Sequence, residues 1–505
     1  MTLLDEKCVA TEESAKQSSL PLTARVVPGV SAVLDNRQLL TELTGALGSP
    51  LNVLLPELVT ANVQGFKDAF KKLQLQGRVF FAHKCNRSDS VVRQLALSSD
   101  ACIDVSSVNE LGHALASGFE GKRIEATGPK TPEFLFVCIQ HGVTVSIDSI
   151  EELKLLLTLR KSLPQAPTTP ILLRLCGFRS SHTRFLNKGS RFGISIDKVD
   201  EAFDILTESG KQLRFLGFSF HLDTVSVPER MIAIENCVQL FEEAVARGFE
   251  PSVLNIGGGY KVNYLADENE WNAYTSALKE GVLGQRATLA WQGNTFGMYV
   301  EQGKLRGNFN SYNYFDSTTG PAFLVDMLQQ QLPDNPDVTA AEFLRDNMIA
   351  LWIEPGRALL DQVGLTVAEV LSVRDSSNGD TLVSLRMKRQ DISFLDQEIF
   401  VDPVIIYQQE PAGADGESVA VYFSGNLCLE SDLIYRHKTY LRALPKPGDL
   451  VVFLNTAGYF MDFSASESIM QPVAKKVALS QRGSQFRWCA DEKYWPLWET
   501  KTGEQ

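Results

Sequence analysis

The sequence is poor in the features that mark secreted, membrane-spanning and metal-binding proteins. Its 505 residues include eight cysteines and six histidines, and the scattered cysteines form no Cys-x-x-Cys pair. A disulfide framework or a metal site needs such clustering, so we expect neither, and reduced thiols fit a cytoplasmic location. No apolar run approaches the roughly 20 residues that span a bilayer. The polar N-terminus has no basic start followed by an apolar stretch, so we expect no secretory signal.

Positive charge is also scarce. Lysine and arginine total 48 against 61 aspartates and glutamates, which gives a formal net charge of −13. This balance disfavours a broad surface for nucleic acid or anionic membranes, and it leaves room for a local basic pocket that binds a phosphate. Hydrophobic residues make up 44% of the chain, an ordinary globular value, and the length allows two or three domains.

Short apolar, β-rich runs alternate with segments of helical period between residues 79 and 356. Eight such runs occur, at 79–85, 101–107, 123–128, 144–149, 171–176, 215–221, 253–259 and 350–356. Strands separated by helices form parallel crossover units, and eight of them favour a closed barrel over an open doubly wound sheet. The sequence therefore predicts an α/β fold, a (β/α)₈ TIM-like barrel, followed by a C-terminal β domain.

The pattern also predicts domain boundaries. Residues 1–20 form a disordered arm, residues 21–48 add an N-terminal strand to the β domain, the barrel spans 49–364, and the β domain spans 365–505. The stretch 283–335, rich in Asn, Gly and aromatic residues, is too long for an ordinary barrel loop. We interpret it as an insertion that is either a lid, a partner contact or structurally idle.

Chemically capable residues stand at the ends of nearly all these runs, where active sites of this barrel gather. They are Lys84, Asp104, Asp148, Arg174, His221, the glycines Gly257, Gly258 and Gly259, Glu354 and Arg357. Lys84 closes an otherwise apolar run, where desolvation would free its amine as a nucleophile for an aldehyde. The alternative is an ordinary strand-end lysine whose ammonium reaches solvent.

The ends of the seventh and eighth runs indicate a phosphate site. Glycines let backbone N–H groups approach phosphate oxygens, and Arg357 can bind such oxygens bidentately. Glu354 could pair with the protonated pyridine nitrogen of a cofactor, or form a salt bridge with Arg357. His221 could stack on a flat ring, or serve a structural role.

Several motifs in order resemble those of the fold-type III pyridoxal-phosphate (PLP) decarboxylases, the ornithine, diaminopimelate and arginine decarboxylase group with an alanine-racemase-like fold. The resemblance covers most of residues 50–465. The stretches that carry it are FFAHKCN, IDVSSVNEL, FSFHLDT, LNIGGGY and IEPGR in the barrel, and GNLCLESD and AGYF in the β domain.

The resemblance implies that PLP is held as a Schiff base on Lys84 and that an amino acid loses CO₂ through a quinonoid intermediate. It also implies a set of cofactor contacts. Asp104 supports the Lys84 side of the ring, Arg174 lies near its phenolic oxygen, His221 stacks on its face and Glu354 pairs with its nitrogen, while Thr224, Gly257, Gly258, Gly259, Arg357 and Tyr459 surround the phosphate.

The resemblance further implies a homodimer with shared active sites, in which Cys428 enters the partner's site and manages protonation of the substrate carbon. The acidic residue that usually follows this cysteine is Leu429 here, so Glu430 and Asp432 become the expected substrate contacts. The aspartate that usually precedes the glycine triplet is Asn255. An unusual amino acid is therefore as plausible a substrate as ornithine, lysine or diaminopimelate.

Two other readings remain open. A racemase or epimerase on the same fold would need bases on both faces of the ring, but alanine racemases carry Asn-Ala-Tyr-Gly after their lysine, whereas this chain has CNRSDS. A non-catalytic PLP-binding relative would tend to lose the cofactor lysine, the glycines or the cysteine, and all of these are present.

Overall fold

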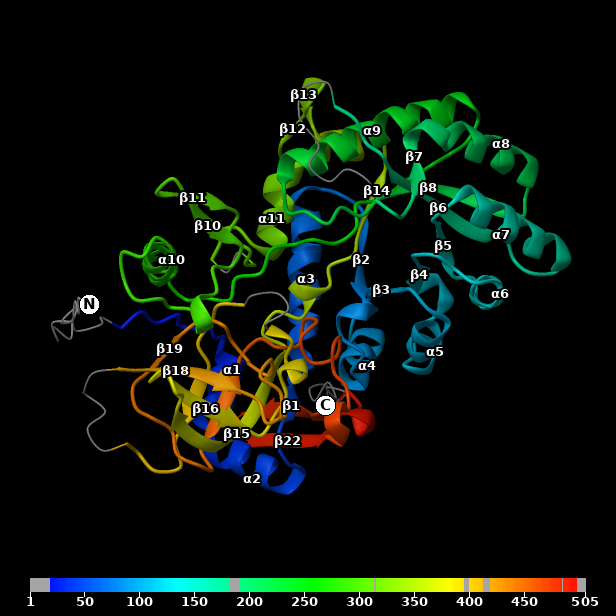
Figure 1. The fold of residues 1–505 in the computed structure, drawn as a ribbon. Helices are drawn as coiled ribbons and strands as arrows, with labels where there is room; N and C mark the ends of the chain where they lie inside the picture. The colour runs from blue at the N-terminus through cyan, green and yellow to red at the C-terminus, as the bar shows by residue number, and fades with distance from the viewer. Residues whose placement is uncertain are drawn as a thin grey trace, which may run out of the picture.

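The computed structural model describes residues 19–180, 190–312, 315–394, 399–411, 418–483 and 485–496. The chain forms two large sheets that lie side by side, a closed barrel and a separate curled sheet (Figure 1). The arm expected over residues 1–20 lies outside the described residues except for its last two positions.

The barrel consists of eight parallel strands, and each corresponds to one of the eight predicted runs. In ring order they are β2 (Gly77–Ala82), β3 (Cys102–Val105), β4 (Ile124–Ala126), β5 (Thr144–Ile147), β6 (Thr169–Cys176), β8 (Leu213–Ser219), β9 (Val253–Asn255) and β14 (Ala350–Ile353). Pairing of β14 with β2 closes the ring, and the short β7 (Ile194–Ser195) adds to β6. The predicted fold class is confirmed.

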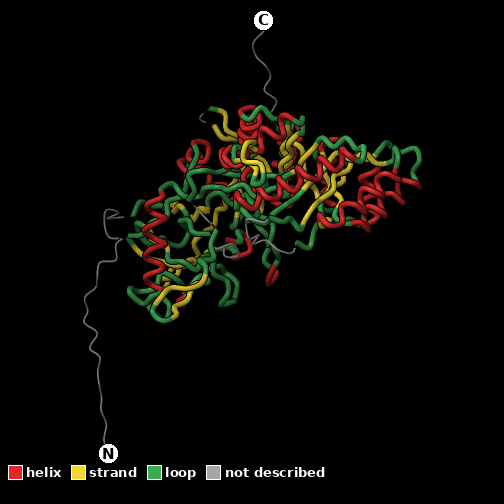
Figure 2. The backbone as a smooth tube through the Cα atoms, turned by 90° about the horizontal axis from the view of Figure 1, so that it is seen from above, coloured by secondary structure: helices red, strands yellow, loops and turns green. Residues whose placement is uncertain are grey.

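Helices flank the barrel strands on the outside (Figure 2). They are α3 (Glu57–Lys72), α4 (Asp89–Ser98), α5 (Val108–Ala116), α6 (Pro132–His141), α7 (Ile150–Ser162), α8 (Val199–Ser209), α9 (Val227–Ala246), α11 (Gly320–Leu328) and α12 (Ala340–Asp346). The helix α10 (Glu268–Val282) lies apart from them (Figure 1) and contacts the β domain, where Tyr274 Oη donates to the carbonyl of Lys438 at 2.7 Å. Side-chain caps fix several helix starts just after the strands, since Ser107 and Ser149 each accept a hydrogen bond from the backbone N–H three residues on. None of the helices in the described part of the chain has the length and hydrophobicity needed to cross a bilayer.

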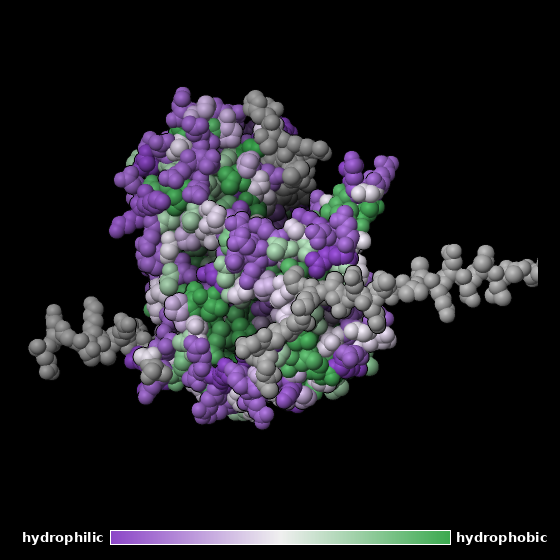
Figure 3. All heavy atoms as spheres, turned by 90° about the vertical axis from the view of Figure 1, so that its left-hand side faces the viewer, coloured by the Kyte–Doolittle hydropathy of each residue, from purple (hydrophilic) through white to green (hydrophobic). Residues whose placement is uncertain are grey.

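The second sheet is largely antiparallel. Its strands are β1 (Leu51–Leu54), β15 (Gly364–Asp375), β16 (Thr381–Leu385), β17 (Val404–Ile406), β18 (Val419–Ser424), β19 (Thr439–Leu441), β20 (Leu450–Phe453), β21 (Lys475–Arg482) and β22 (Gln485–Ala490). The strand β1 joins it from the N-terminal side, antiparallel to β15 and parallel to β21. On the left-hand side of Figure 1, apolar residues gather in patches between polar ones (Figure 3).

The prediction of a strand within residues 21–48 was wrong. That segment forms two helices, α1 (Pro28–Asp35) and α2 (Arg37–Leu47), and the strand lies at β1 instead. Proline begins α1, and the Asn36 side chain caps α2 by accepting a hydrogen bond from the backbone N–H of Leu39. We propose that the barrel begins at α3, after β1, rather than at residue 49.

The stretch 283–335 contains a hairpin, β10 (Met298–Glu301) with β11 (Lys304–Gly307), and the helix α11. A second hairpin, β12 (Gln331–Leu332) with β13 (Asn335–Thr339), begins at its end. Because α11 packs against α3, part of this stretch belongs to the helical layer of the barrel.

Candidate active site

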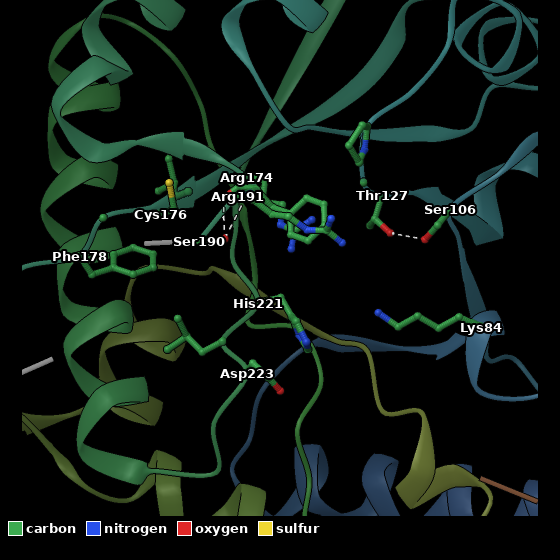
Figure 4. Close-up of a pocket in the computed structure, with 16 residues that line it drawn as sticks. Lys84, Ser106, Thr127, Arg174, Cys176, Phe178, Ser190, Arg191, His221 and Asp223 are labelled. Atoms are coloured by element: carbon green, nitrogen blue, oxygen red, sulfur yellow. Dashed lines mark hydrogen bonds between the residues drawn. The ribbon is translucent and has the colours of Figure 1, made fainter. Parts of the chain in front are cut away.

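Two cavities meet at the carboxyl ends of the barrel strands. The cavity of Figure 4 has a volume of about 550 Å³, and the second has about 660 Å³. Lys84 and His221 line both cavities. In Figure 4, Lys84 extends into the cavity from the side of β2, and His221 reaches it from the segment after β8. The predicted lysine and histidine therefore lie at the junction of two spaces.

Lys84 lies in a one-turn 3₁₀ helix, His83–Cys85, that follows β2. Lys84 is exposed to the cavity while His83, Cys85 and Asn86 are buried. The Asn86 side chain donates a hydrogen bond to the carbonyl of Ala457 at 2.8 Å, which ties this turn to the β domain. The buried neighbours therefore fix the backbone and leave the amine accessible.

A row of titratable side chains supports this turn, and the sequence analysis did not find it. His83 Nε2 and His113 Nδ1 lie 2.8 Å apart. His113 Nε2 lies 2.8 Å from Asp89 Oδ1, and His83 Nδ1 lies 3.3 Å from Glu110 Oε1. The row joins the starts of α4 and α5 to the turn that carries Lys84.

Two predicted carboxylates lie close to the lysine. Asp104 on β3 accepts a hydrogen bond from Thr127 Oγ1 at 2.5 Å, and burial raises its pKa while the Lys84 charge lowers it. Burial, followed by the charge of Asp104, raises the pKa of Glu354 to about 7. A carboxyl group with such a pKa gains from a cationic partner placed beside it.

The ring of His221 is held by the glycine turn. Its Nδ1 accepts a hydrogen bond from the backbone N–H of Gly258 at 3.1 Å. Burial, followed by the charge of Lys84, lowers the pKa of His221 to about 3. The imidazole is therefore neutral near neutral pH, with its orientation fixed.

The glycine turn leaves no room for side chains. Gly257 and Gly259 have φ of +66° and +88°, and a Cβ on Gly258 would lie 2.7 Å from the carbonyl oxygen of Glu354. The buried Arg230, absent from the sequence-based prediction, donates to the carbonyls of Gly258 and Thr224. Arg230 therefore joins the glycine turn to the loop of Thr224, which also lines the second cavity.

Arg357 lies among aromatic rings at the second cavity. Its guanidinium carbon lies 4.9 Å from the ring centre of Tyr312, 5.2 Å from that of Tyr459 and 4.8 Å from that of Phe460. Its Nη1 also donates to Tyr264 Oη at 2.8 Å. Since guanidinium stays charged, this cage fixes a cation at the cavity. Sequence reasoning missed its three partners other than Tyr459.

Arg174 lines the cavity of Figure 4 from β6. Its Nη1 donates to Asp148 Oδ1 at 3.2 Å, and its guanidinium lies 4.8 Å from the ring centre of Phe192. The ion pair and the ring contact hold the guanidinium at the cavity wall.

The predicted proton donor and substrate contacts of the β domain lie elsewhere. Cys428 and Glu430 are exposed, and among the described residues neither they nor Asp432 line the two cavities. Asp432 is buried, and its carboxylate accepts hydrogen bonds from the backbone N–H groups of Arg389 and Leu427, both at 2.8 Å. Both oxygens of Asp432 are therefore engaged in holding the loop, and its role as a substrate contact stays a prediction.

Comparisons with known proteins identify relatives of this chain. Residues 58–305 match the family model described as pyridoxal-dependent decarboxylase, pyridoxal binding domain. The chain is 30% identical over 430 residues to uncharacterized protein y4yA of Sinorhizobium fredii, covering 84% of this chain and 86% of that protein. It is 28% identical over 251 residues to diaminopimelate decarboxylase of Bacillus subtilis, covering 46% of this chain and 56% of that enzyme.

A solved structure shows the same fold. The diaminopimelate decarboxylase of M. jannaschii in complex with L-lysine superposes with a TM-score of 0.66 at 18% identity, over 93% of this chain and 95% of that one. These matches confirm the resemblance and the cofactor that it implies. The chain belongs to the fold-type III PLP-dependent decarboxylases, and it is a carboxy-lyase of the ornithine, arginine and diaminopimelate decarboxylase type.

Proposed function

We propose that this protein removes the α-carboxylate of an amino acid of the ornithine, lysine or diaminopimelate type, or of an unusual relative, with PLP attached to Lys84. The observation that carries the proposal is the position of Lys84 where the two cavities meet, with the glycine turn and the caged Arg357 at the second cavity.

The residues present fit the cofactor. Gly258 and Gly259 line the second cavity, and glycines there let backbone groups approach a phosphate closely. Arg357 supplies a fixed positive charge at the same cavity, and Thr224 and Tyr459 complete the proposed phosphate contacts. Glu354 faces the pyridine nitrogen in this arrangement. When bound, PLP supplies the electron sink that accepts the bonding pair left by CO₂.

The chain's own groups have separate roles in this proposal. The Lys84 amine would hold PLP through the aldehyde carbon of the cofactor. The neutral His221 offers a flat ring face, and Asp104 and Arg174 hold the two sides of the site. Glu354, with a pKa of about 7, stabilises a proton on the facing nitrogen.

The substrate side chain is assigned to the cavity of Figure 4, on the far side of Lys84 from the phosphate site. Arg174, Cys176 and Phe178 line this cavity. We propose a homodimer in which Cys428 protonates the substrate carbon in the partner's site and Glu430 approaches the substrate. Their exposure on the β domain supports this assignment.

The test is spectroscopic and chemical. The purified protein should show the visible absorbance of lysine-bound PLP and should release CO₂ from one member of a panel of basic and acidic amino acids. Loss of substrate chirality without CO₂ release would favour a racemase. Absence of the absorbance after incubation with PLP would contradict the proposal.

A further inference from the structure

A row of buried polar side chains crosses the barrel beneath the site. Glu125 lies in β4, Asn255 ends β9 and Glu354 follows β14. In the ring order, β4 and β9 stand opposite each other. Asn255 Nδ2 donates to Glu125 Oε2 at 2.8 Å and to Glu354 Oε1 at 2.7 Å. One amide therefore bridges two carboxyl groups across the barrel axis.

The orientation of this amide is fixed. Asn255 Oδ1 accepts a hydrogen bond from the backbone N–H of Gly257 at 2.9 Å. A flipped amide would turn its NH₂ toward that N–H and its oxygen toward two carboxyl groups. Both amide hydrogens are therefore committed to Glu125 and Glu354, and an aspartate at this position could not donate in their place.

Glu125 has little to stabilise a negative charge. It is fully buried, and its Oε1 has no hydrogen-bond partner among the described residues. Asp104, its register neighbour on β3, and Glu354 both face it with like charge. The positive charge of Lys130 lowers the pKa of Glu125, but the Lys130 ammonium donates a hydrogen bond to Glu152 Oε1, at 2.8 Å. Burial, followed by the charge of Glu354, raises the pKa of Glu125 well above its ordinary value.

Glu354 is placed differently. It lines the second cavity, and the positive charges of Lys84 and Arg174 lower its pKa against the effects of burial and Asp104. Two interacting carboxyl groups in a buried site share one negative charge, and the charge settles on the better stabilised member. Here that member is Glu354.

We propose that Glu125 is a positioning residue that keeps the proton of this pair, so that Glu354, joined to it through the Asn255 amide, carries the negative charge at the cofactor site. The inference rests on the proposed function, in which Glu354 faces the pyridine nitrogen. It also gives Asn255 a specific role, because its two donors hold one neutral and one charged carboxyl group in place.

The first test is infrared spectroscopy of the PLP-loaded protein. A protonated carboxyl group has a C=O stretch distinct from that of a carboxylate, and we expect such a band near neutral pH that Glu125→Gln removes. Ser146→Ala is the matched control, because Ser146 lies in the same interior, where its Oγ is 2.8 Å from Ser219 Oγ, and its variant should keep the band. A band unchanged by Glu125→Gln would overturn the proposal.

The second test measures PLP affinity, first in a variant that keeps Glu125. Asn255→Asp removes both donors and adds a third acid, so PLP should bind about tenfold or more weakly, which is the effect of one pKa unit of charge stabilisation. In the double variant Asn255→Asp with Glu125→Gln, the row again has one amide and two carboxyl groups. Most of the PLP affinity should therefore return. A double variant as weak as Asn255→Asp would contradict the proposal. If the wild-type protein bound no PLP, the proposed function would fail instead, while the infrared band, recorded without PLP, would still report the proton on Glu125.

Discussion

The barrel mouth and the loop 425–432 of the β domain differ in how many of their functional side chains have partners within the same chain. At the barrel mouth, the groups around Lys84 have partners within the chain, such as Asn255 for Glu354 and the aromatic cage for Arg357. In the loop, Cys428 and Glu430 are exposed. The difference teaches that the cofactor half of the proposed site is preformed, whereas the proton-donor half faces outward, as a surface shared with a second chain would.

The β domain nevertheless takes part in the preformed half. The backbone N–H of Tyr459 donates to the carbonyl of Cys85 at 2.9 Å, and Ala457 accepts from Asn86. Ala457 and Tyr459 therefore hold the lysine turn to the β domain. Variants in the two regions should fail in different ways.

The largest expected effect is at Lys84. Lys84→Ala should abolish decarboxylation, the visible absorbance of bound PLP and borohydride trapping, because no other amine is proposed to bind the aldehyde. Lys154→Ala is the control, since Lys154 is exposed and paired with Glu201 on the barrel surface. A borohydride-stable adduct on another lysine in Lys84→Ala would show that the assignment is wrong.

The second prediction tests whether the loop acts in a partner's site. Cys428→Ala should retain PLP and lose most of its amine formation. Mixing it with Lys84→Ala should restore up to about a quarter of wild-type activity, because half of the dimers are mixed and each has one intact site. If the two variants exchange subunits and activity still does not recover, each site is built within one chain.

The third prediction concerns the caged cation. Arg357→Ala removes a charge-assisted contact worth on the order of 1.5–3 kcal/mol, so PLP affinity should fall roughly tenfold to a hundredfold. Titration with PLP measures this change. Arg345→Ala, on the exposed surface of α12, should leave the affinity unchanged. An Arg357 variant with wild-type affinity would remove this residue from the phosphate site.

The fourth prediction concerns the loop itself. Asp432→Ala leaves two backbone N–H groups without their acceptor, so the free energy of unfolding should fall by about 1–3 kcal/mol. Glu430→Ala, two residues away and exposed, should have little effect on stability. Denaturant unfolding measures both. A raised KM with unchanged stability in Asp432→Ala would instead make Asp432 a substrate contact.

The smallest effect is on the pH dependence of stability without PLP. Glu354 has a folded-state pKa of about 7, above that of an exposed glutamate, so the folded protein binds this proton more tightly. Its stabilising contribution is complete below the ordinary glutamate pKa and is lost as the pH rises through about 7. The melting temperature of the wild type, relative to Glu354→Gln, should fall over this range.

Asp402 provides the matched comparison for that measurement. Burial also raises its pKa to about 7, but its Oδ2 accepts from the backbone N–H of Leu22, at 2.7 Å, and it lines neither cavity. PLP should remove the pH dependence due to Glu354 and leave that due to Asp402. Removal of both would point to a general stabilisation by the cofactor.

The sequence by itself determined the barrel and much of its mouth. Apolar runs and helical periods are local patterns, and they marked all eight barrel strands. Because the carboxyl ends of parallel strands converge at one end of a barrel, the sequence alone groups Lys84, Glu354 and the glycine turn. The helices α1 and α2 were missed because the apolar residues of 21–48 suit either a strand or a helix over so short a length.

Only the tertiary structure decided which side chains meet across the fold. The cage of Arg357 draws Tyr264 and Tyr312 from loops far away in the chain, and the bridge from Asn255 to Glu125 crosses the barrel between opposite strands. Asp432 has the residue type of a ligand, yet its burial against backbone N–H groups makes it a structural acceptor. Such pairings depend on closure of the ring and packing of the two domains, and no local period records them.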